Sequence, residues 1–127
     1  MSRTQIQPAS FPVPKVKTTA GVLVDKTLYV SGMLAMDAQG QVIGAGDIQA
    51  QTRHVLESIR TVVEAAGGRM SNVAHNAIFL KDFADYAGMN SVYAEYFPQD
   101  PPARYCVRAD LYQPACLVEI SAIAVLD

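Results

Sequence analysis

The amino-acid sequence predicts an α+β fold, a two-layer sandwich in which a mixed sheet of about six strands is covered on one face by two helices. Two segments repeat apolar residues at spacings of three and four, as amphipathic helices do, and several short runs rich in Val, Ile and Tyr are typical of strands. These segments follow one another in the order β-β-α-β-α-β-β. A chain of 127 residues has the size of one domain, so we expect a single domain over residues 1–127.

The composition favours a small cytoplasmic protein that hides part of its surface in an oligomer. Half of the residues are hydrophobic and only 17% are charged, which is a low charged fraction for a domain. The net charge of −2 argues against nucleic acid as a partner, because phosphate backbones require a basic face. No signal peptide and no membrane span are expected. The two cysteines lack the spacing of a zinc site, and we expect no metal.

The N-terminal third is predicted to begin with an extended arm and to continue as a hairpin. Residues 1–14 contain three prolines and are expected to be extended rather than part of a regular element. Strands are predicted near residues 21–24 and 27–35, with a tight turn at residues 25–26 between them. The stretch 36–46 holds three glycines and is predicted to be a loop.

The first helix is predicted to begin after Asp47, a good N-cap residue, and to end at Gly67-Gly68. Its periodic stripe consists of Ile48, Thr52, Val55, Leu56, Ile59, Val62, Val63 and Ala66. A strand at 73–80 is predicted to lead into a second helix at about 84–97, which is ended by a proline-rich link.

Two final strands are predicted at residues 103–111 and 117–126, and we interpret them as a C-terminal hairpin. The two helices are expected to cover one face of the sheet. Nothing remains in the chain to cover the other face, so a trimer or dimer contact is the expected cover.

The second helix is predicted to carry one amide on an otherwise aromatic face. Spacings of three and four place on this face Phe83, Tyr86, Asn90, Tyr93 and Phe97. A buried amide without hydrogen-bond partners costs ~1–3 kcal/mol. Asn90 is therefore expected either to bond a neighbouring loop carbonyl or to brace an active-site loop.

The predicted C-terminal hairpin brings together residues that could act on a small acid. If its turn is centred on residues 112–113, Cys106 falls opposite Glu119, with Arg104 beside them. Arginine holds a carboxylate by a two-bonded fork, and a glutamate can activate water or move a proton. Cysteine can be a nucleophile, a proton donor or a small wall of the site. The ordinary alternatives are a cross-strand salt bridge and an inert buried thiol, and spacing alone does not decide between them.

Several strings of the sequence occur in an order that is typical of one family. They are Tyr29-Val30-Ser31-Gly32, Ala50-Gln51-Thr52-Arg53, Glu64-Ala65-Ala66-Gly67-Gly68, Asn90 to Phe97, Pro102-Ala103-Arg104 with Cys106, and Val118-Glu119-Ile120. Over roughly residues 20–126 the chain resembles the Rid/YjgF family of reactive-intermediate deaminases. Segments 50–59, 93–97 and 102–106 are most similar to the aminoacrylate deaminase of the pyrimidine-utilisation pathway.

The resemblance implies a chorismate-mutase-like homotrimer with its sites in clefts between subunits, and neither a metal nor an organic cofactor. It implies that Arg104 grips the carboxylate of an enamine or imine substrate and that Glu119 positions the attacking water. Ser31, Gly32 and Cys106 would line the pocket, with Asn90 nearby.

The chain departs from this family pattern in the early loop, where many members carry an aromatic residue that closes over the site. The expected position holds Thr18 in this chain, and Phe11 is an alternative. The substrate preference of the site therefore stays open.

Two other functions remain open at this stage. One is a pericyclic enzyme of the chorismate-mutase type, which would need several cations, with Arg108 as a second beside Arg104. The other is a non-catalytic trimeric module that binds a small acid or has a regulatory role. Glu119 argues against the module, because a negative charge beside Arg104 would not help carboxylate binding. Which enamine is the substrate, 3-aminoacrylate, 2-aminoacrylate or a larger relative, is also open.

Overall fold

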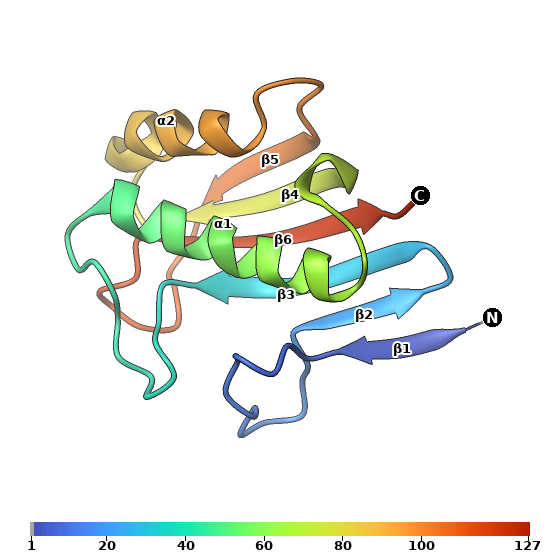
Figure 1. Ribbon diagram of the computed structural model, residues 1–127. Coiled ribbons are helices and arrows are strands. Elements are labelled where there is room, and N and C mark those ends of the chain that lie inside the picture. Colours follow the sequence, from blue (N-terminus) through green and yellow to red (C-terminus); the bar gives the residue numbers. More distant parts are fainter. Residues whose placement is uncertain (1) are drawn as a thin grey trace.

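The computed structural model describes residues 2–127, and in this range the chain forms one six-stranded sheet and two α-helices (Figure 1). The elements are β1 (Arg3–Ile6), β2 (Gly21–Val24), β3 (Thr27–Leu34), α1 (Ile48–Ala65), β4 (Val73–Leu80), α2 (Tyr86–Tyr96), β5 (Ala103–Arg108) and β6 (Val118–Val125). Short 3-10 turns at Met70–Asn72 and Phe83–Asp85 precede β4 and α2.

The strands are arranged in the order β1-β2-β3-β6-β4-β5, with β1 and β5 at the two edges. Only the β4–β5 pair is parallel, and the other pairs are antiparallel, so the sheet is mixed. Both helices pack side by side on the same face of the sheet (Figure 1). The predicted two-layer α+β fold is confirmed.

Helix α1 begins and ends where the sequence predicts. The side chain of Asp47 accepts a hydrogen bond of 3.0 Å from the backbone N–H of Ala50. At the other end Gly67 adopts a φ of 91°, a left-handed conformation that favours glycine, and the N–H of Gly68 donates to the carbonyl of Val63. The cap and the stop therefore hold the helix to its predicted length.

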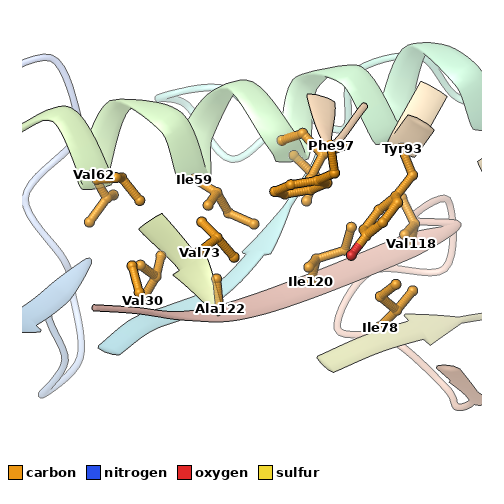
Figure 2. Close-up of a cluster of buried hydrophobic side chains, with 14 of the residues drawn as sticks. Val30, Ile59, Val62, Val73, Ile78, Tyr93, Phe97, Val118, Ile120 and Ala122 are labelled. Carbon is orange, nitrogen blue, oxygen red and sulfur yellow. The ribbon is translucent and has the colours of Figure 1, made fainter. Parts of the chain in front are cut away.

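The hydrophobic core lies between the helices and the sheet (Figure 2). From α1 it includes Val55, Leu56, Ile59, Val62 and Val63, and from β6 it includes Val118, Ile120, Ala122 and Ala124. Every second residue of β6 faces the helices, which confirms the apolar face predicted for this strand. Burial of one large aliphatic side chain contributes about 1.5–3 kcal/mol to stability.

The predicted C-terminal hairpin is wrong. Strand β4 lies between β5 and β6 and is hydrogen-bonded to both. The unit β4-α2-β5 is a crossover connection, and such connections place parallel strands beside each other. The chain then passes the end of β4, where Ala109 bonds Leu80 and Lys81 bonds Leu117 through their backbones, before β6 begins.

The N-terminal arm also differs from the expectation. Residues Arg3–Ile6 form β1, which pairs antiparallel with β2 and supplies the sixth strand. The remainder of the arm and the following segment up to Ala20 form a loop beside the start of β2. Prolines 8, 12 and 14 all lie in that loop, after the strand, where their missing N–H groups are not needed by a ladder.

The second face of the sheet is not covered by any helix of the described chain (Figure 1). Its exposed large side chains include Tyr29, Tyr105, Val107 and Val125, of which Tyr29 and Tyr105 are each 50% exposed. We call this surface the open face. Neither α1 nor α2 is long and apolar enough to cross a membrane.

Candidate functional site

Arg104 lies on the edge strand β5 and points to the side of the sheet that carries the helices. Its guanidinium carbon is 4.7 Å from the ring centre of Tyr93 and 5.9 Å from that of Tyr86, both on α2. Its Nη2 donates a hydrogen bond of 3.2 Å to the hydroxyl of Tyr86. Within residues 2–127 no carboxylate is within ion-pair distance of Arg104. The guanidinium is therefore held by aromatic contacts and keeps N–H groups for an incoming anion.

The ring of Tyr93 is itself fixed from below by Asn76 of β4. Asn76 is fully buried, and its Nδ2 donates a hydrogen bond of 2.9 Å to the hydroxyl of Tyr93. Asn76 is also the register partner of Arg104 on the neighbouring strand. Sequence reasoning missed Asn76, although a lone amide in the apolar run of β4 was a visible signal. We call Arg104, Tyr86, Tyr93, Asn76 and Cys106 the arginine site.

Cys106 lies two residues beyond Arg104 on the same face and is half-buried against the core. Burial raises the pKa of its thiol, and the charge of Arg104 offsets this effect in part. A raised pKa keeps the sulfur protonated near neutral pH, whereas a nucleophile needs the thiolate. The surroundings of Cys106 favour a wall of the site over a nucleophile.

Glu119 points to the opposite side of the sheet from Arg104. Its neighbours Val118 and Ile120 are buried under the helices, so the alternation of β6 directs Glu119 to the open face. A Cβ placed on Gly32 would overlap the carboxylate of Glu119 and lie 3.1 Å from its Cδ. Burial raises the pKa of Glu119. In the described chain no cation forms an ion pair with this carboxylate.

A β-bulge on β3 creates the space that Glu119 occupies. The pairing of β3 with β6 shifts between Val30 and Met33, so that Ser31 and Gly32 together face the single residue Ser121. Glycine at this point leaves room that any side chain would fill. We call Glu119, Ser31 and Gly32 the glutamate site.

Ser31 holds the N-terminal loop against this site. Its Oγ donates to the carbonyl of Thr19 at 2.6 Å, and its N–H donates to the carbonyl of Ala20. A cavity of about 790 Å³ opens here, lined by Ser31 and Gly32 together with Phe11 and Thr18. Both residues considered for closing the site therefore line the same cavity as Ser31 and Gly32, whereas Glu119 does not line it.

Gln51 is a second residue that sequence reasoning missed, because it lies among the apolar stripe of α1. It is fully buried, and both ends of its amide are used. Its Nε2 donates to the carbonyl of Ala115 at 2.9 Å, and its Oε1 accepts from the N–H of Leu117 at 2.7 Å. These bonds fix the segment that leads into β6 and thereby the start of the strand that carries Glu119.

The structure brings Arg104 and Cys106 together but does not place Glu119 with them in one subunit. The predicted pairing of Cys106 with Glu119 is wrong, because Cys106 pairs with Ile78 and Glu119 pairs with Phe79. The alternative of a salt bridge between Arg104 and Glu119 of one chain is equally wrong. Both errors follow from the insertion of β4 between the two strands.

The predicted aromatic face of α2 runs from solvent into the core. Tyr86 is 44% exposed, whereas Tyr93 and Phe97 are buried. Asn90 lies between Tyr86 and Tyr93 on this face and is half-buried, so its predicted role stays a prediction. Arg108 is four residues along β5 from Arg104, or about 13 Å, and does not converge with it.

No three His, Cys, Asp or Glu side chains gather into a possible metal site within the described residues.

Comparison with known proteins identifies the family. The family model described as endoribonuclease L-PSP matches residues 10–126. The chain belongs to this family. A Rid family protein from Yersinia pestis is 28% identical, with a TM-score of 0.90, over 98% of this chain and 100% of that chain. The YjgF gene product of E. coli is also 28% identical, with a TM-score of 0.86, over 96% of this chain and 98% of that chain.

A third similar structure, from Thermotoga maritima, is described as an endoribonuclease. It is 27% identical, with a TM-score of 0.89, and the match covers 98% of each chain. These relatives confirm the Rid/YjgF membership that the sequence strings predict. They share the six-stranded sheet and two helices over nearly their whole length.

Proposed function

We propose that this L-PSP family member is a deaminase that hydrolyses a reactive enamine or imine bearing a carboxylate, with release of ammonia and a carbonyl acid. The observation that supports the proposal is that two charged side chains, Arg104 and Glu119, are held in place without a partner of opposite charge in the described chain. Arg104 presents its guanidinium on aromatic rings, and Glu119 presents a half-buried carboxylate over Gly32; neither has an ion-pair partner among residues 2–127. An anion anchor and a general base are the two groups that hydrolysis of such a substrate requires.

The active species in this proposal is a homotrimer with sites between subunits. Arg104 and Glu119 of one chain are on opposite faces of the sheet, so a site that uses both needs a second copy. The exposed aromatic and aliphatic side chains of the open face, among them Tyr29, Tyr105 and Val107, favour burial of this face. Light scattering should return three times the chain mass of 13.7 kDa, and a monomer would contradict the proposal.

The chemistry proceeds in four steps that need no cofactor in this proposal. The enamine takes up a proton at carbon and loses one from nitrogen, which gives the imine. Glu119 accepts a proton from water as the water oxygen bonds to the imine carbon. Glu119 then passes this proton to nitrogen, which gives an amino alcohol. The hydroxyl proton of the amino alcohol moves to nitrogen as the carbonyl forms, and the C–N bond breaks to release ammonia, while Arg104 holds the carboxylate throughout.

The substrate class that we favour is a three-carbon aminoacrylate. The similarity of segments 50–59, 93–97 and 102–106 to the aminoacrylate deaminase of pyrimidine utilisation supports this choice. Ammonia release from 3-aminoacrylate, 2-aminoacrylate and a larger enamine acid, each generated in the assay, would rank them. Equal rates for all three would contradict the narrow class.

Two substitutions separate binding from chemistry. Binding is measured with pyruvate, the carbonyl acid that hydrolysis of 2-aminoacrylate gives. Arg104→Ala removes charge-assisted bonds worth ~1.5–3 kcal/mol each, so both the affinity for pyruvate and the rate of ammonia release should fall. Arg104→Lys should recover little, because the planar fork is lost. Glu119→Gln should keep pyruvate binding and lose ~10²–10⁴-fold in rate.

The alternative function is a non-catalytic module that binds small acids. It predicts pyruvate binding that depends on Arg104, with no ammonia release above the buffer rate in any variant. Ammonia release that Glu119→Gln leaves unchanged would remove the proposed base. An RNA-cleavage assay on the same samples tests the activity that the family's name carries, and cleavage abolished by Glu119→Gln would redirect the proposal.

A further inference from the structure

Asn76 is a buried amide that the proposed chemistry does not use. It lies in the centre of β4, between β5 and β6, and is fully buried. Its Nδ2 bonds the Tyr93 hydroxyl, whereas its Oδ1 has no hydrogen-bond partner among residues 2–127. A buried acceptor without a partner destabilises the fold, and an apolar side chain would avoid this cost. The position therefore calls for an explanation other than stability.

The single hydrogen bond of Asn76 leads directly to Arg104. Figure 2 shows the Tyr93 ring directed from α2 toward the sheet, with its hydroxyl at the lower end. The Asn76 amide fixes this lower end, and the guanidinium of Arg104 lies 4.7 Å from the ring centre. Burial raises the pKa of Tyr93, so the hydroxyl stays neutral and remains a partner for the amide.

A second contact fixes the same guanidinium from the solvent side. The hydroxyl of Tyr86 accepts from Nη2 of Arg104, and Tyr86 lies about two helical turns before Tyr93 on α2. The Tyr93 ring thus contacts the guanidinium of Arg104, and the Tyr86 hydroxyl engages one of its N–H groups. The direction of the guanidinium depends on where the Tyr93 ring sits.

We propose that Asn76 is a positioning residue, which sets the direction of the Arg104 fork through the hydroxyl and ring of Tyr93. The inference rests on the proposed function, because it assigns the fork to a substrate carboxylate. A fork held in one orientation binds a carboxylate without the entropy loss of ordering a free side chain. The unsatisfied Oδ1 is the structural cost of placing an amide where only its N–H group is needed.

The experiment measures pyruvate binding by calorimetry in Asn76→Leu, Tyr93→Phe and the double variant. Tyr93→Phe keeps the ring under the guanidinium and removes only the hydroxyl, so it tests the same bond if Asn76→Leu folds poorly. Each single variant should weaken pyruvate binding by about 2- to 10-fold, the worth of one neutral hydrogen bond. The double variant should bind pyruvate no more weakly than the more weakly binding of the two single variants, because both substitutions break the same Asn76–Tyr93 hydrogen bond.

A spectroscopic measurement separates positioning from general destabilisation. The ¹⁵N relaxation of the Nε–H group of Arg104, assigned by its loss in Arg104→Lys, should report a restrained group in the native protein. It should report a mobile group in Asn76→Leu and Tyr93→Phe. The matched control is Thr52→Val, which removes the second buried side-chain atom without a hydrogen-bond partner within residues 2–127, Thr52 Oγ1 on α1. It should change neither pyruvate affinity nor the Arg104 signal.

Native affinity and a native Arg104 signal in Tyr93→Phe would overturn the inference, provided that Arg104→Ala abolishes binding. Additive losses in the double variant would overturn it as well. Undiminished pyruvate binding in Arg104→Ala would instead remove the proposed function, and the role of Asn76 with it.

Discussion

Arg104 and Glu119 lie on opposite faces of one sheet, with strand β4 between the strands that carry them. Arg104 contacts the rings of α2 on the helical side, and Glu119 leans over Gly32 on the open side. A reaction that needs both groups on one small substrate is impossible within a single subunit. This relationship makes the proposed chemistry dependent on assembly, and it gives a direct test.

A mixture of two inactive variants should regain activity. Arg104→Ala removes the anchor of every site and Glu119→Gln removes the base of every site. In a mixed trimer, however, some sites combine Arg104 from a Glu119→Gln chain with Glu119 from an Arg104→Ala chain. If the two chains combine at random in equal amounts, about one quarter of the sites contain both native residues. Ammonia release by the co-refolded mixture should therefore reach about one quarter of the native rate.

The double variant Arg104→Ala with Glu119→Gln, co-refolded with native protein, provides the matched control. In the trimers of this mixture, a site contains both Arg104 and Glu119 only where the two subunits that form it are both native. The activity should therefore again be about one quarter of the native rate. No regain in the first mixture, together with verified mixed trimers by mass spectrometry, would show that the two groups do not share an intersubunit site.

Gly32→Ala should slow the reaction by moving Glu119. The new Cβ would overlap the glutamate carboxylate, and the flexible side chain must swing aside. Misplacement of a reacting group by about 1 Å can cost ~10²-fold in rate, so we expect a loss of about this size with pyruvate binding retained. Adding Gly32→Ala to Glu119→Gln should cause little further loss. A further full loss in that background would mean that Gly32 acts independently of Glu119.

Glu119→Gln should raise the melting temperature near neutral pH. Because burial raises the pKa of Glu119 in the folded protein, the folded state binds more protons than the unfolded state between the two pKa values. Stability therefore falls as the pH rises through this window, and Gln removes the loss. The gain should vanish below the ordinary carboxyl pKa of about 4.3. Glu64→Gln, an exposed change on α1, controls for the lost charge.

A lower melting temperature of Glu119→Gln at neutral pH would contradict this prediction. It would indicate that a cation from a neighbouring subunit pairs with Glu119 in the resting assembly.

Cys106→Ser should keep substantial deaminase activity, with a loss well below the ~10²–10⁴-fold that removal of an acid–base group causes. The raised thiol pKa leaves little thiolate, and hydrolysis of an imine uses activated water. Intact-protein mass spectrometry during turnover should find no adduct on Cys106. Cys116→Ala is the matched control, since Cys116 is the fully buried second thiol. A substrate adduct that Cys106→Ser abolishes would establish covalent catalysis instead.

The sequence by itself determined the local structure of this protein. The Asp47 cap, the Gly67-Gly68 stop and the strand Val73–Leu80 depend on residues that are neighbours along the chain, and all three are confirmed. The alternation of β6 likewise determined that Glu119 faces away from the core. These features follow from periodicity and backbone preference, which act within a few residues.

Only the tertiary structure decided which strands are neighbours. Residues of β5 and β6 follow each other in the chain, yet the crossover through α2 places β5 beside β4, and β4 fills the space next to β6. Long-range hydrogen bonding satisfies both edges of β4, whose apolar residues need burial in the centre of the sheet. That pairing separates Glu119 from Arg104, and it brings Asn76 under Tyr93. Neither arrangement could be predicted from the sequence, because both depend on contacts between residues that are far apart in the chain.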